Sequence, residues 1–389
     1  MTVGIIKCIL IIRNKCMKFD YEIKYYDFFL LFLMIGLNIC GILIVRSASN
    51  MDATTVSRQI IGSLAGVCAC IIVSFIDYRK LIKYSVLIFG VCLAFLVAVK
   101  LLGIVHKGAG RWINLPVLGQ VQPSEFCKVG IIIFFAGFFE KHRETVSSPK
   151  TFFKGALLFA LPAALILAQP NLSTTIIITV IFSFMVFASG ISFKWVFGVV
   201  GSFLALFAAV MYTFRTDLYE KLPLLPYQKQ RILGFLYPEE YSNTFYQQEN
   251  SMLAIGSGGL YGKGLYNTGI DSVKAGNFLI EEDTDFIFAI IGEELGFRGC
   301  VIILAAFLLI MILTLYHGGK SKDMAGKLIC VGMASWLAFQ TFTNIAVAMG
   351  LFPTTGVTLP FFSRGVSSLL SIYIGMGIVL NIGLQRKTK

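Results

Sequence analysis

Long apolar segments dominate the chain and constrain its fold more than any other feature. Ten of them fall near residues 28–45, 58–76, 82–102, 126–140, 195–214, 286–315, 326–351 and 366–385, with two within 155–193. A helix crosses a bilayer with about 20 apolar residues. Lipid offers no hydrogen-bond partners, so unbroken apolar runs predict helices rather than a β-barrel. We therefore predict an all-α polytopic membrane protein with about ten transmembrane helices.

Composition agrees with this prediction. Only 14% of the 389 residues are charged, against about 25% in soluble domains. The net charge of +12 fits Lys and Arg in cytoplasmic loops, and because these residues are dispersed we expect no nucleic-acid partner. The nine cysteines and three histidines form no cluster with metal-ligand spacing.

Basic residues in the short loops predict the orientation. Most Lys and Arg lie in the loops on one side, which places both termini in the cytoplasm. The expected organisation is a cytoplasmic segment 1–26, one transmembrane domain 27–385 and a cytoplasmic tail 386–389. Residues 215–285, between spans seven and eight, then form a large extracytoplasmic loop. A loop this long in a compact domain is usually functional.

Acidic residues gather at the end of this loop. Six lie within 14 positions: Glu281, Glu282, Asp283, Asp285, Glu293 and Glu294. Asp285 is the last polar residue before an apolar run, where partial desolvation raises a carboxyl pKa and makes a better base. Acidic residues also complement a helix N-terminus, and this reading is favoured for the three that precede Thr284. For Asp285 both readings stay open.

Glu293 and Glu294 lie eight and nine residues beyond Asp285. In a helix they would sit about 12 Å deeper, where a carboxylate is costly and must face a cavity or a partner. Arg298 follows Glu294 by four residues, so a pair on one helix face is one reading. The other reading is a functional cavity, and the sequence leaves both open.

Two further segments combine charge with a membrane boundary. In "QPSEFCK", Glu125 and Lys128 share a helix face, either as a neutralising pair or as part of a site. In "GAGRWI", Trp112 is typical of an interface anchor, and Arg111 has the planar fork that suits phosphate. The glycine-rich "GSGGLYGKG" lacks the Ser or Thr that a phosphate loop needs after Gly-Lys, so it predicts a tightly turning loop.

In this order, these segments resemble the SEDS family of bacterial membrane proteins (shape, elongation, division and sporulation), which includes RodA, FtsW and SpoVE. The resemblance covers about residues 20–385. Its motifs are "GAGRWI", "QPSEFCK", "QPNLSTT", "YQKQRILGFLYPEE", "AIGSGGLYGKG", "TDFIFAIIGEELGF", "NIAVAMGLFPTTGVTLPF" and "SRGVSSLL". It implies ten spans with a large outer loop before the eighth.

The resemblance also implies an activity. The family is known for polymerising lipid II, an undecaprenyl-diphosphate-linked disaccharide-pentapeptide, at the outer face of the bacterial cytoplasmic membrane. It works with class B penicillin-binding protein transpeptidases. The family's essential aspartate falls on Asp285, and its Glu-Lys pair falls on Glu125 and Lys128. An α-linked donor and a β-linked product imply an inverting glycosyltransferase that uses direct displacement.

Glycan extension needs a base for the acceptor hydroxyl and positive charge for the leaving diphosphate. Asp285 is the expected base. The expected substrate-binding residues are Arg111, Trp112, Glu125, Lys128, Arg231, Glu293 and Glu294. An apolar cavity between spans would hold the lipid tails. A divalent cation, Mg²⁺ or Mn²⁺, at Asp285 and the diphosphate is physically reasonable, but the sequence names no metal ligand.

Other functions and several details stay open. A lipid II flippase and a non-catalytic scaffold of the cell-wall synthesis complex are the alternatives. The sequence does not choose between elongation, division and sporulation, or between Met1 and Met17 as the start. It departs from the family pattern at Asn171, Asp283, Arg364 and Val366. Arg364 adds a cation on the outer face, where it could meet phosphate.

Overall fold

The structure is a computed structural model. It describes residues 23–49, 51–102, 104–106, 109–115, 119–216, 218–221, 226–267, 269, 272–274, 276, 278–279 and 282–385. Met1, Met17, Glu281, most of the expected N-terminal segment and the tail 386–389 lie outside these residues.

Long helices coincide with the ten apolar segments. In the described part of the chain they are α2 (Phe28–Ala48), α3 (Ala53–Ser74), α5 (Ser85–Leu102), α6 (Pro123–Lys141), α7 (Pro149–Leu167), α8 (Leu172–Ala188), α9 (Phe193–Arg215), α12 (Ile287–Gly319), α13 (Met324–Ala348) and α14 (Val366–Leu384). Six of the helices within the described residues, α2, α3, α7, α12, α13 and α14, are long and apolar enough to cross a membrane. The helical membrane fold class is confirmed, and the count of ten spans stays a prediction.

Shorter elements connect these helices. They are η1 (Ile23–Tyr25), α4 (Tyr78–Lys83), β1 (Ile104–His106), β2 (Ala109–Leu115), β3 (Gly119–Val121), η2 (Arg143–Thr145), η3 (Leu218–Lys221), α10 (Pro226–Leu236) and α11 (Ser242–Ser257). The three strands form a small antiparallel sheet in the order β1-β2-β3, which the sequence did not predict. The large loop predicted at 215–285 carries α10 and α11.

Asp and Asn side chains begin several of the helices. Asp27 accepts a hydrogen bond from the backbone N–H of Leu30 at 2.9 Å, and Asp52 caps α3 in the same way. Asn171 caps α8 after the expected turn in "QPNLSTT". These side chains satisfy N–H groups that a helix start leaves without partners. The cap at Asp52 explains why α3 begins at Ala53, five residues before the expected span.

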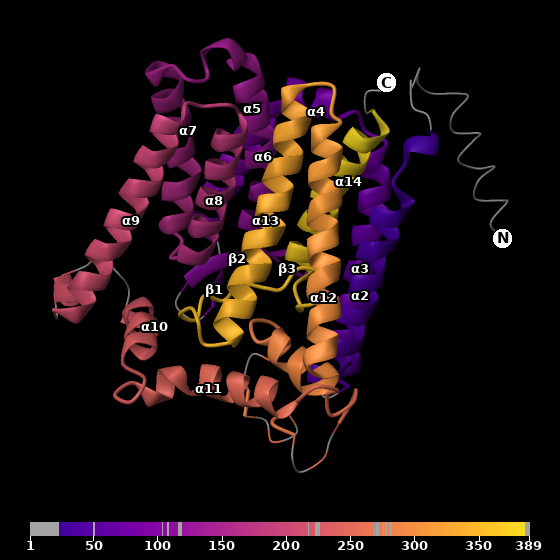
Figure 1. The fold of residues 1–389 in the computed structure, drawn as a ribbon, viewed down its shortest axis with the longest axis vertical. Helices are drawn as coiled ribbons and strands as arrows, with labels where there is room; N and C mark the ends of the chain where they lie inside the picture. Colours follow the sequence, from indigo (N-terminus) through magenta and orange to yellow (C-terminus); the bar gives the residue numbers. More distant parts are fainter. Residues whose placement is uncertain are drawn as a thin grey trace.

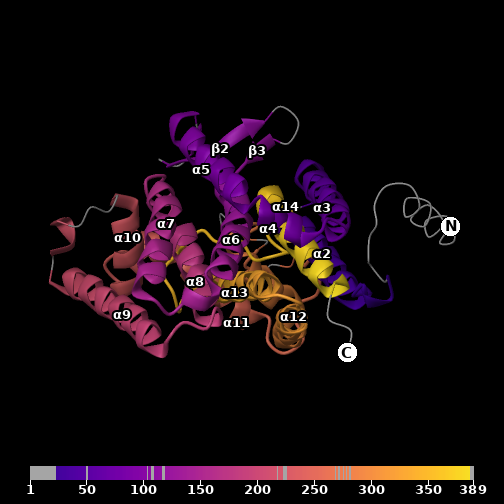
Figure 2. The same ribbon diagram turned by 90° about the horizontal axis from the view of Figure 1, so that it is seen from above.

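The long helices lie side by side in one bundle, and its two ends differ (Figure 1). The start of α2 and the end of α14 lie at one end, and α10, α11 and the sheet lie at the other. Seen along the bundle, α14 lies between α3 and the α6–α13 pair (Figure 2). Close packing supports this position, since a Cβ on Gly377 of α14 would lie 2.6 Å from the Cys70 carbonyl oxygen of α3.

Helix α12 breaks at Gly296, where φ is +63°. The glycine-rich loop after α11 supplies hydrogen-bond partners to the helix backbone on both sides of the break. The N–H groups of Lys263 and Gly264 donate to the carbonyls of Glu293 and Glu294 at 2.9 and 3.0 Å. Beyond the break, the N–H groups of Phe297 and Arg298 donate to loop carbonyls at 2.9 and 3.2 Å. A broken membrane helix needs such replacement partners, so this loop is a backbone clip and not a phosphate loop.

Gly262 lets the clip approach the helix, which predicts a strong effect of substitution. Its φ is +79°, and a Cβ there would lie 2.1 Å from the Glu294 carbonyl oxygen. We expect Gly262→Val to destabilise the protein by about 3 kcal/mol or more, measured by thermal unfolding in detergent. Gly264→Ala is the matched control, because its φ is +89° but a Cβ there meets nothing within 4 Å. Equal losses in both variants would argue against the clip.

Candidate functional site

Asp285 lies in the turn that leads into α12, and hydrogen bonds from distant residues fix this turn. The Asn344 side chain of α13 donates to the Asp285 carbonyl oxygen at 2.8 Å. The Ser363 hydroxyl donates to the Thr284 carbonyl oxygen at 2.6 Å. The backbone of Asp285 is therefore held by α13 and by the segment before α14. Such outside support keeps a functional side chain in one orientation.

Arg231 of α10 comes close to Asp285. A Cβ on Gly356 would lie 3.4 Å from the Asp285 Oδ2 atom and 3.9 Å from the Arg231 Nη1 atom. The carboxylate and the guanidinium therefore flank the same glycine, whose φ of +71° also excludes most side chains. Arg231 further donates to the Thr354 carbonyl oxygen at 3.4 Å. The structure thus brings together a predicted base and a predicted phosphate ligand from two distant parts of the chain.

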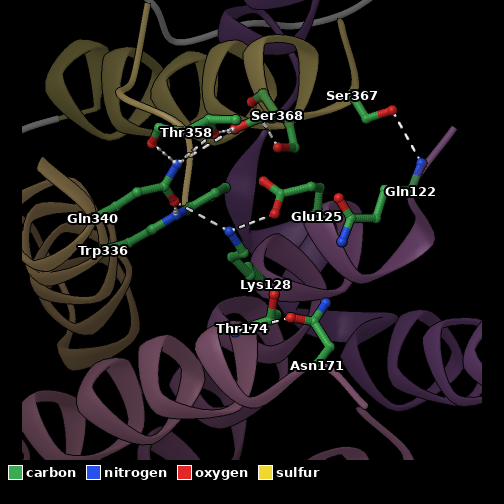
Figure 3. Close-up of polar contacts among 11 residues, drawn as sticks. Gln122, Glu125, Lys128, Asn171, Thr174, Trp336, Gln340, Thr358, Ser367 and Ser368 are labelled. Carbon is green, nitrogen blue, oxygen red and sulfur yellow. Dashed lines mark hydrogen bonds and ion pairs between the residues drawn. The ribbon is translucent and has the colours of Figure 1, made fainter. Parts of the chain in front are cut away.

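Glu125 and Lys128 form a buried ion pair at the start of α6 (Figure 3). The Lys128 Nζ atom lies 2.8 Å from the Glu125 Oε1 atom, and the Lys128 side chain is 1% exposed. Lys128 also donates to the Gln340 Oε1 atom at 3.1 Å and lies 4.8 Å from the centre of the Trp336 ring. Pro123 at the helix start and Glu125 in the first turn suit a helix N-terminus. The predicted shared face of Glu125 and Lys128 is confirmed.

Gln340 and Asn344 join this cluster to the Asp285 turn. They lie one helical turn apart on α13. Gln340 donates to the Thr358 carbonyl oxygen at 2.9 Å, and Asn344 donates to the Val357 carbonyl oxygen at 2.7 Å. Both amides thus hold neighbouring peptides of one segment. The sequence interpretation missed these two residues, although polar side chains four residues apart within an apolar run were a usable signal.

Arg111 and Trp112 lie on β2. Arg111 donates to the carbonyl oxygens of Gln169 and Pro170, in the turn between α7 and α8. That turn carries Asn171, whose Nδ2 atom is buried and has no hydrogen-bond partner among the described residues. Figure 3 shows Asn171 beside the Glu125–Lys128 cluster. Arg111 therefore stabilises the turn next to the cluster, and Trp112 pairs with Ile104 in the sheet.

Glu293 and Glu294 are engaged in ion pairs with the large loop. Glu293 accepts from the Lys263 side chain at 3.0 Å and from the Val273 backbone N–H at 2.7 Å. Glu294 pairs with Lys274 at 2.5 Å and accepts from the Ser47 hydroxyl of α2. The structure therefore favours structural pairing over cavity lining for both carboxylates. Their loop partners also take the place of Arg298.

Arg298 does not form the helix-face pair considered for Glu294. Its guanidinium lies 4.3 Å from the centre of the Tyr261 ring instead. The break at Gly296 explains the difference, because an i,i+4 pair needs a continuous helix between the two residues.

Glu282 is a buried carboxyl near the end of the large loop, three residues before Asp285. Its pKa is raised to about 8, chiefly by burial and further by the negative charges of Asp283, Glu293 and Glu294, whereas Lys274 lowers it. A carboxyl whose pKa is higher in the folded than in the unfolded state stabilises the fold below the unfolded value. That contribution is lost as pH rises toward 8, with a slope of up to about 1.4 kcal/mol per pH unit.

We expect Glu282→Gln to leave stability nearly unchanged at pH 5 and to raise it at pH 9. Glutamine resembles the protonated carboxyl and carries no charge to bury. Thermal unfolding at the two pH values checks this expectation. Glu249→Gln, at an exposed position on α11, is the control. A variant that is equally stabilised at both pH values would contradict the titration of Glu282.

Two departures from the family pattern are partners in the structure. The Arg364 Nη1 atom lies 3.0 Å from the Asp283 Oδ2 atom. Arg364 therefore points to a carboxylate rather than standing as an isolated cation. Val366, a third departure, packs at the start of α14, where a Cβ on Gly62 of α3 would lie 3.0 Å from its side chain.

An apolar cavity of about 370 Å³ lies between α12 and α13. Its lining includes Leu304, Phe307, Leu308, Phe342, Ile345 and Met349. Among the described residues, no three His, Cys, Asp or Glu side chains gather around one point that could hold a metal ion.

Known proteins resemble this chain over nearly its whole length. The model of the family described as cell cycle protein, FtsW/RodA/SpoVE, matches residues 25–388. The chain is 34% identical over 378 residues to "Probable peptidoglycan glycosyltransferase FtsW" of Geobacter metallireducens, which covers 94% of this chain and 96% of the relative. It is 32% identical over 375 residues to "Peptidoglycan glycosyltransferase MrdB" of Escherichia coli K12, covering 96% and 98%.

Solved structures show the same fold. A chain in "Structural coordination of polymerization and crosslinking by a peptidoglycan synthase complex" has a TM-score of 0.76 at 26% identity and covers 92% of this chain and 97% of its own. The rod shape determining protein RodA of Thermus thermophilus has a TM-score of 0.69 at 25% identity, with coverage of 96% and 99%.

Proposed function

The chain belongs to the FtsW/RodA/SpoVE family of cell cycle proteins, and we infer from its relatives that it is a peptidoglycan glycosyltransferase. It is a multi-pass membrane protein with an inverting transferase activity. Its substrate is lipid II, whose long prenyl chain suits an apolar site such as the cavity between α12 and α13. The observation that carries the residue-level proposal is the placement of Asp285 and Arg231 around Gly356.

In this proposal Asp285 is the general base. It takes the proton from the acceptor sugar hydroxyl while the oxygen attacks the anomeric carbon of the donor sugar. The bond from that carbon to the diphosphate oxygen breaks, and undecaprenyl diphosphate leaves with the electron pair. Attack from the face opposite the leaving group converts the α-linkage to a β-linkage. No covalent enzyme intermediate is needed.

Arg231 is the best placed of the three expected cations to stabilise the leaving diphosphate. Its guanidinium lies beside Asp285 at Gly356, and a planar fork suits phosphate oxygens. Lys128 is held by Glu125 and Gln340, and Arg111 is held by the α7–α8 turn. We assign these two cations to the support of the site rather than to direct contact with phosphate.

The proposed orientation places the Asp285 end of the bundle at the outer face of the bacterial cytoplasmic membrane. The opposite end, where α2 starts and α14 ends, then faces the cytoplasm, as the basic loops predict. A class B penicillin-binding protein is the proposed partner. A fold shared with a chain of a synthase complex that couples polymerization and crosslinking supports this choice.

The test is conversion of labelled lipid II to glycan strands by the purified full chain in liposomes, alone and with its transpeptidase partner. We expect β-linked strands, resolved by gel electrophoresis and degraded by a muramidase. Movement of fluorescent lipid II across the bilayer without strand formation would instead identify a flippase. Neither activity with the partner present would identify a scaffold.

A further inference from the structure

The outer edge of the Asp285 turn is closed by an ion pair between two segments 81 positions apart. The Arg364 Nη1 atom lies 3.0 Å from the Asp283 Oδ2 atom, and the Arg364 backbone N–H donates to the Asp283 carbonyl oxygen at 2.8 Å. The two residues therefore meet through both backbone and side chain. Asp283 is only 13% exposed, whereas Arg364 is 46% exposed.

The neighbouring residues make the same contact continuous. Ser363 donates its hydroxyl proton to the Thr284 carbonyl oxygen at 2.6 Å and accepts from the Leu359 N–H at 2.8 Å. The Ser363 carbonyl oxygen accepts from Gln59 of α3 at 3.4 Å. Residues 363–364 thus hydrogen-bond to residues 283–284, and Ser363 is held in turn by Gln59 of α3.

Asp285 directly follows residues 283–284, and its carbonyl oxygen accepts a hydrogen bond from Asn344. The backbone carbonyl oxygens of residues 283, 284 and 285 therefore each accept a hydrogen bond from a different residue. The Arg364 side chain adds an ion pair with Asp283 to this support. Loss of that pair would let the turn shift. Effective catalysis needs reacting groups aligned to within fractions of an ångström, so such a shift would slow the reaction.

We propose that the Asp283–Arg364 ion pair is a positioning clamp that sets the orientation of Asp285 for proton transfer. The clamp rests on the proposed function of Asp285 as the base. It also assigns the Arg364 charge to Asp283 rather than to the substrate diphosphate. Arg364 and Asp283 are thus positioning residues, and neither touches the reacting atoms.

The competing assignment is a direct phosphate contact by Arg364, and the two make opposite predictions. A clamp acts on the chemical step, so its loss lowers kcat and leaves KM for lipid II nearly unchanged. A phosphate ligand that binds the ground state acts on KM. A clamp also requires both partners, so removal of either should have the same effect, and removal of both should cost no more than removal of one.

The experiment measures kcat and KM of the full chain with its partner for Arg364→Met, Asp283→Asn and the double variant. We expect about a fivefold loss of kcat in each, the size that an ion pair with one exposed member can supply, with equal losses in the single and double variants. Arg364→Lys should recover most of kcat, because lysine keeps the charge. The exchanged pair, Asp283→Arg with Arg364→Asp, should also recover part of it.

Arg79→Met is the matched control, because Arg79 forms a similar part-exposed pair with Asp323 at 3.4 Å on a different part of the bundle. It should lose similar thermal stability and retain kcat. A rise in KM for Arg364→Met that Asp283→Asn does not share would overturn the clamp. So would full kcat in Arg364→Met. Strand synthesis at the native rate in an Asp285→Asn variant would instead refute the proposed base, whatever the clamp variants show.

Discussion

Asp285→Asn is expected to reduce strand synthesis from lipid II by about a hundredfold to ten-thousandfold. Asparagine keeps the size of the side chain but cannot accept the hydroxyl proton, and general-base catalysis contributes about 10²–10⁴ in rate. The Asp285 carbonyl would still accept from Asn344, because that bond involves the backbone. The loss should therefore appear in kcat and not in the amount of folded protein.

Two controls make this result specific. Thermal unfolding of Asp285→Asn should match that of the native chain, because Asp285 is only partly buried. Asp285→Glu keeps the carboxylate but moves it by one methylene, so it should retain more activity than Asp285→Asn. Strand synthesis at the native rate by a stable Asp285→Asn protein would remove Asp285 from the mechanism.

Breaking the Glu125–Lys128 pair is expected to have the largest effect on stability. Glu125→Ala leaves the Lys128 ammonium buried next to Gln340 and the Trp336 ring, without its carboxylate partner. Removing one partner of a buried ion pair typically costs about 3–5 kcal/mol. We expect a correspondingly lower unfolding temperature in detergent, lower yield from membranes and weak strand synthesis.

A double variant separates burial from function. Glu125→Gln with Lys128→Met removes both charges and should recover most of the lost stability. If the positive charge of Lys128 also supports the site, this stable double variant should still synthesise strands slowly. Recovery of both stability and activity would show that Glu125 and Lys128 only neutralise each other and that the Lys128 charge does not support the site. Unchanged stability and activity in Glu125→Ala would contradict the expected cost of an unpaired Lys128.

Much of the fold was predictable because its main signal is local. A long apolar run in lipid must become a helix, and long helices formed at the ten runs. The small sheet was not predictable in this way. Two of its strands have only three residues, and the seven-residue β2, AGRWINL, does not alternate strictly between apolar and polar residues.

The site was predictable where a residue type contradicts its surroundings. Asp285 stood out as a carboxylate at the mouth of an apolar run, and Glu125 and Lys128 stood out through their spacing. Residues whose role depends on the path of a distant loop were harder. The partners of Glu293 and Glu294 are Lys263 and Lys274, which reach α12 only because the loop folds back on it.

Gln340 and Arg364 show the same limit from the other side. Gln340 supports Lys128 from α13, and nothing in the order of the sequence brings α13 to α6. Arg364 was interpreted as a cation that could meet phosphate, since sequence gives its charge but not its direction. The fold of residues 351–365 decides that it meets Asp283. Side-chain direction across segments distant in sequence comes only from tertiary packing.

The most direct test of the central claim asks whether Asp285 removes the acceptor proton. It compares native protein with Asp285→Asn on two acceptors, lipid II and an analogue with fluorine on the carbon next to the attacking hydroxyl. Fluorine makes that hydroxyl more acidic, so the reaction depends less on a base. If Asp285 is the base, the ratio of native to variant rates will fall clearly with the fluorinated acceptor. The same ratio with both acceptors would contradict this role and leave Asp285 as a residue that only binds substrate.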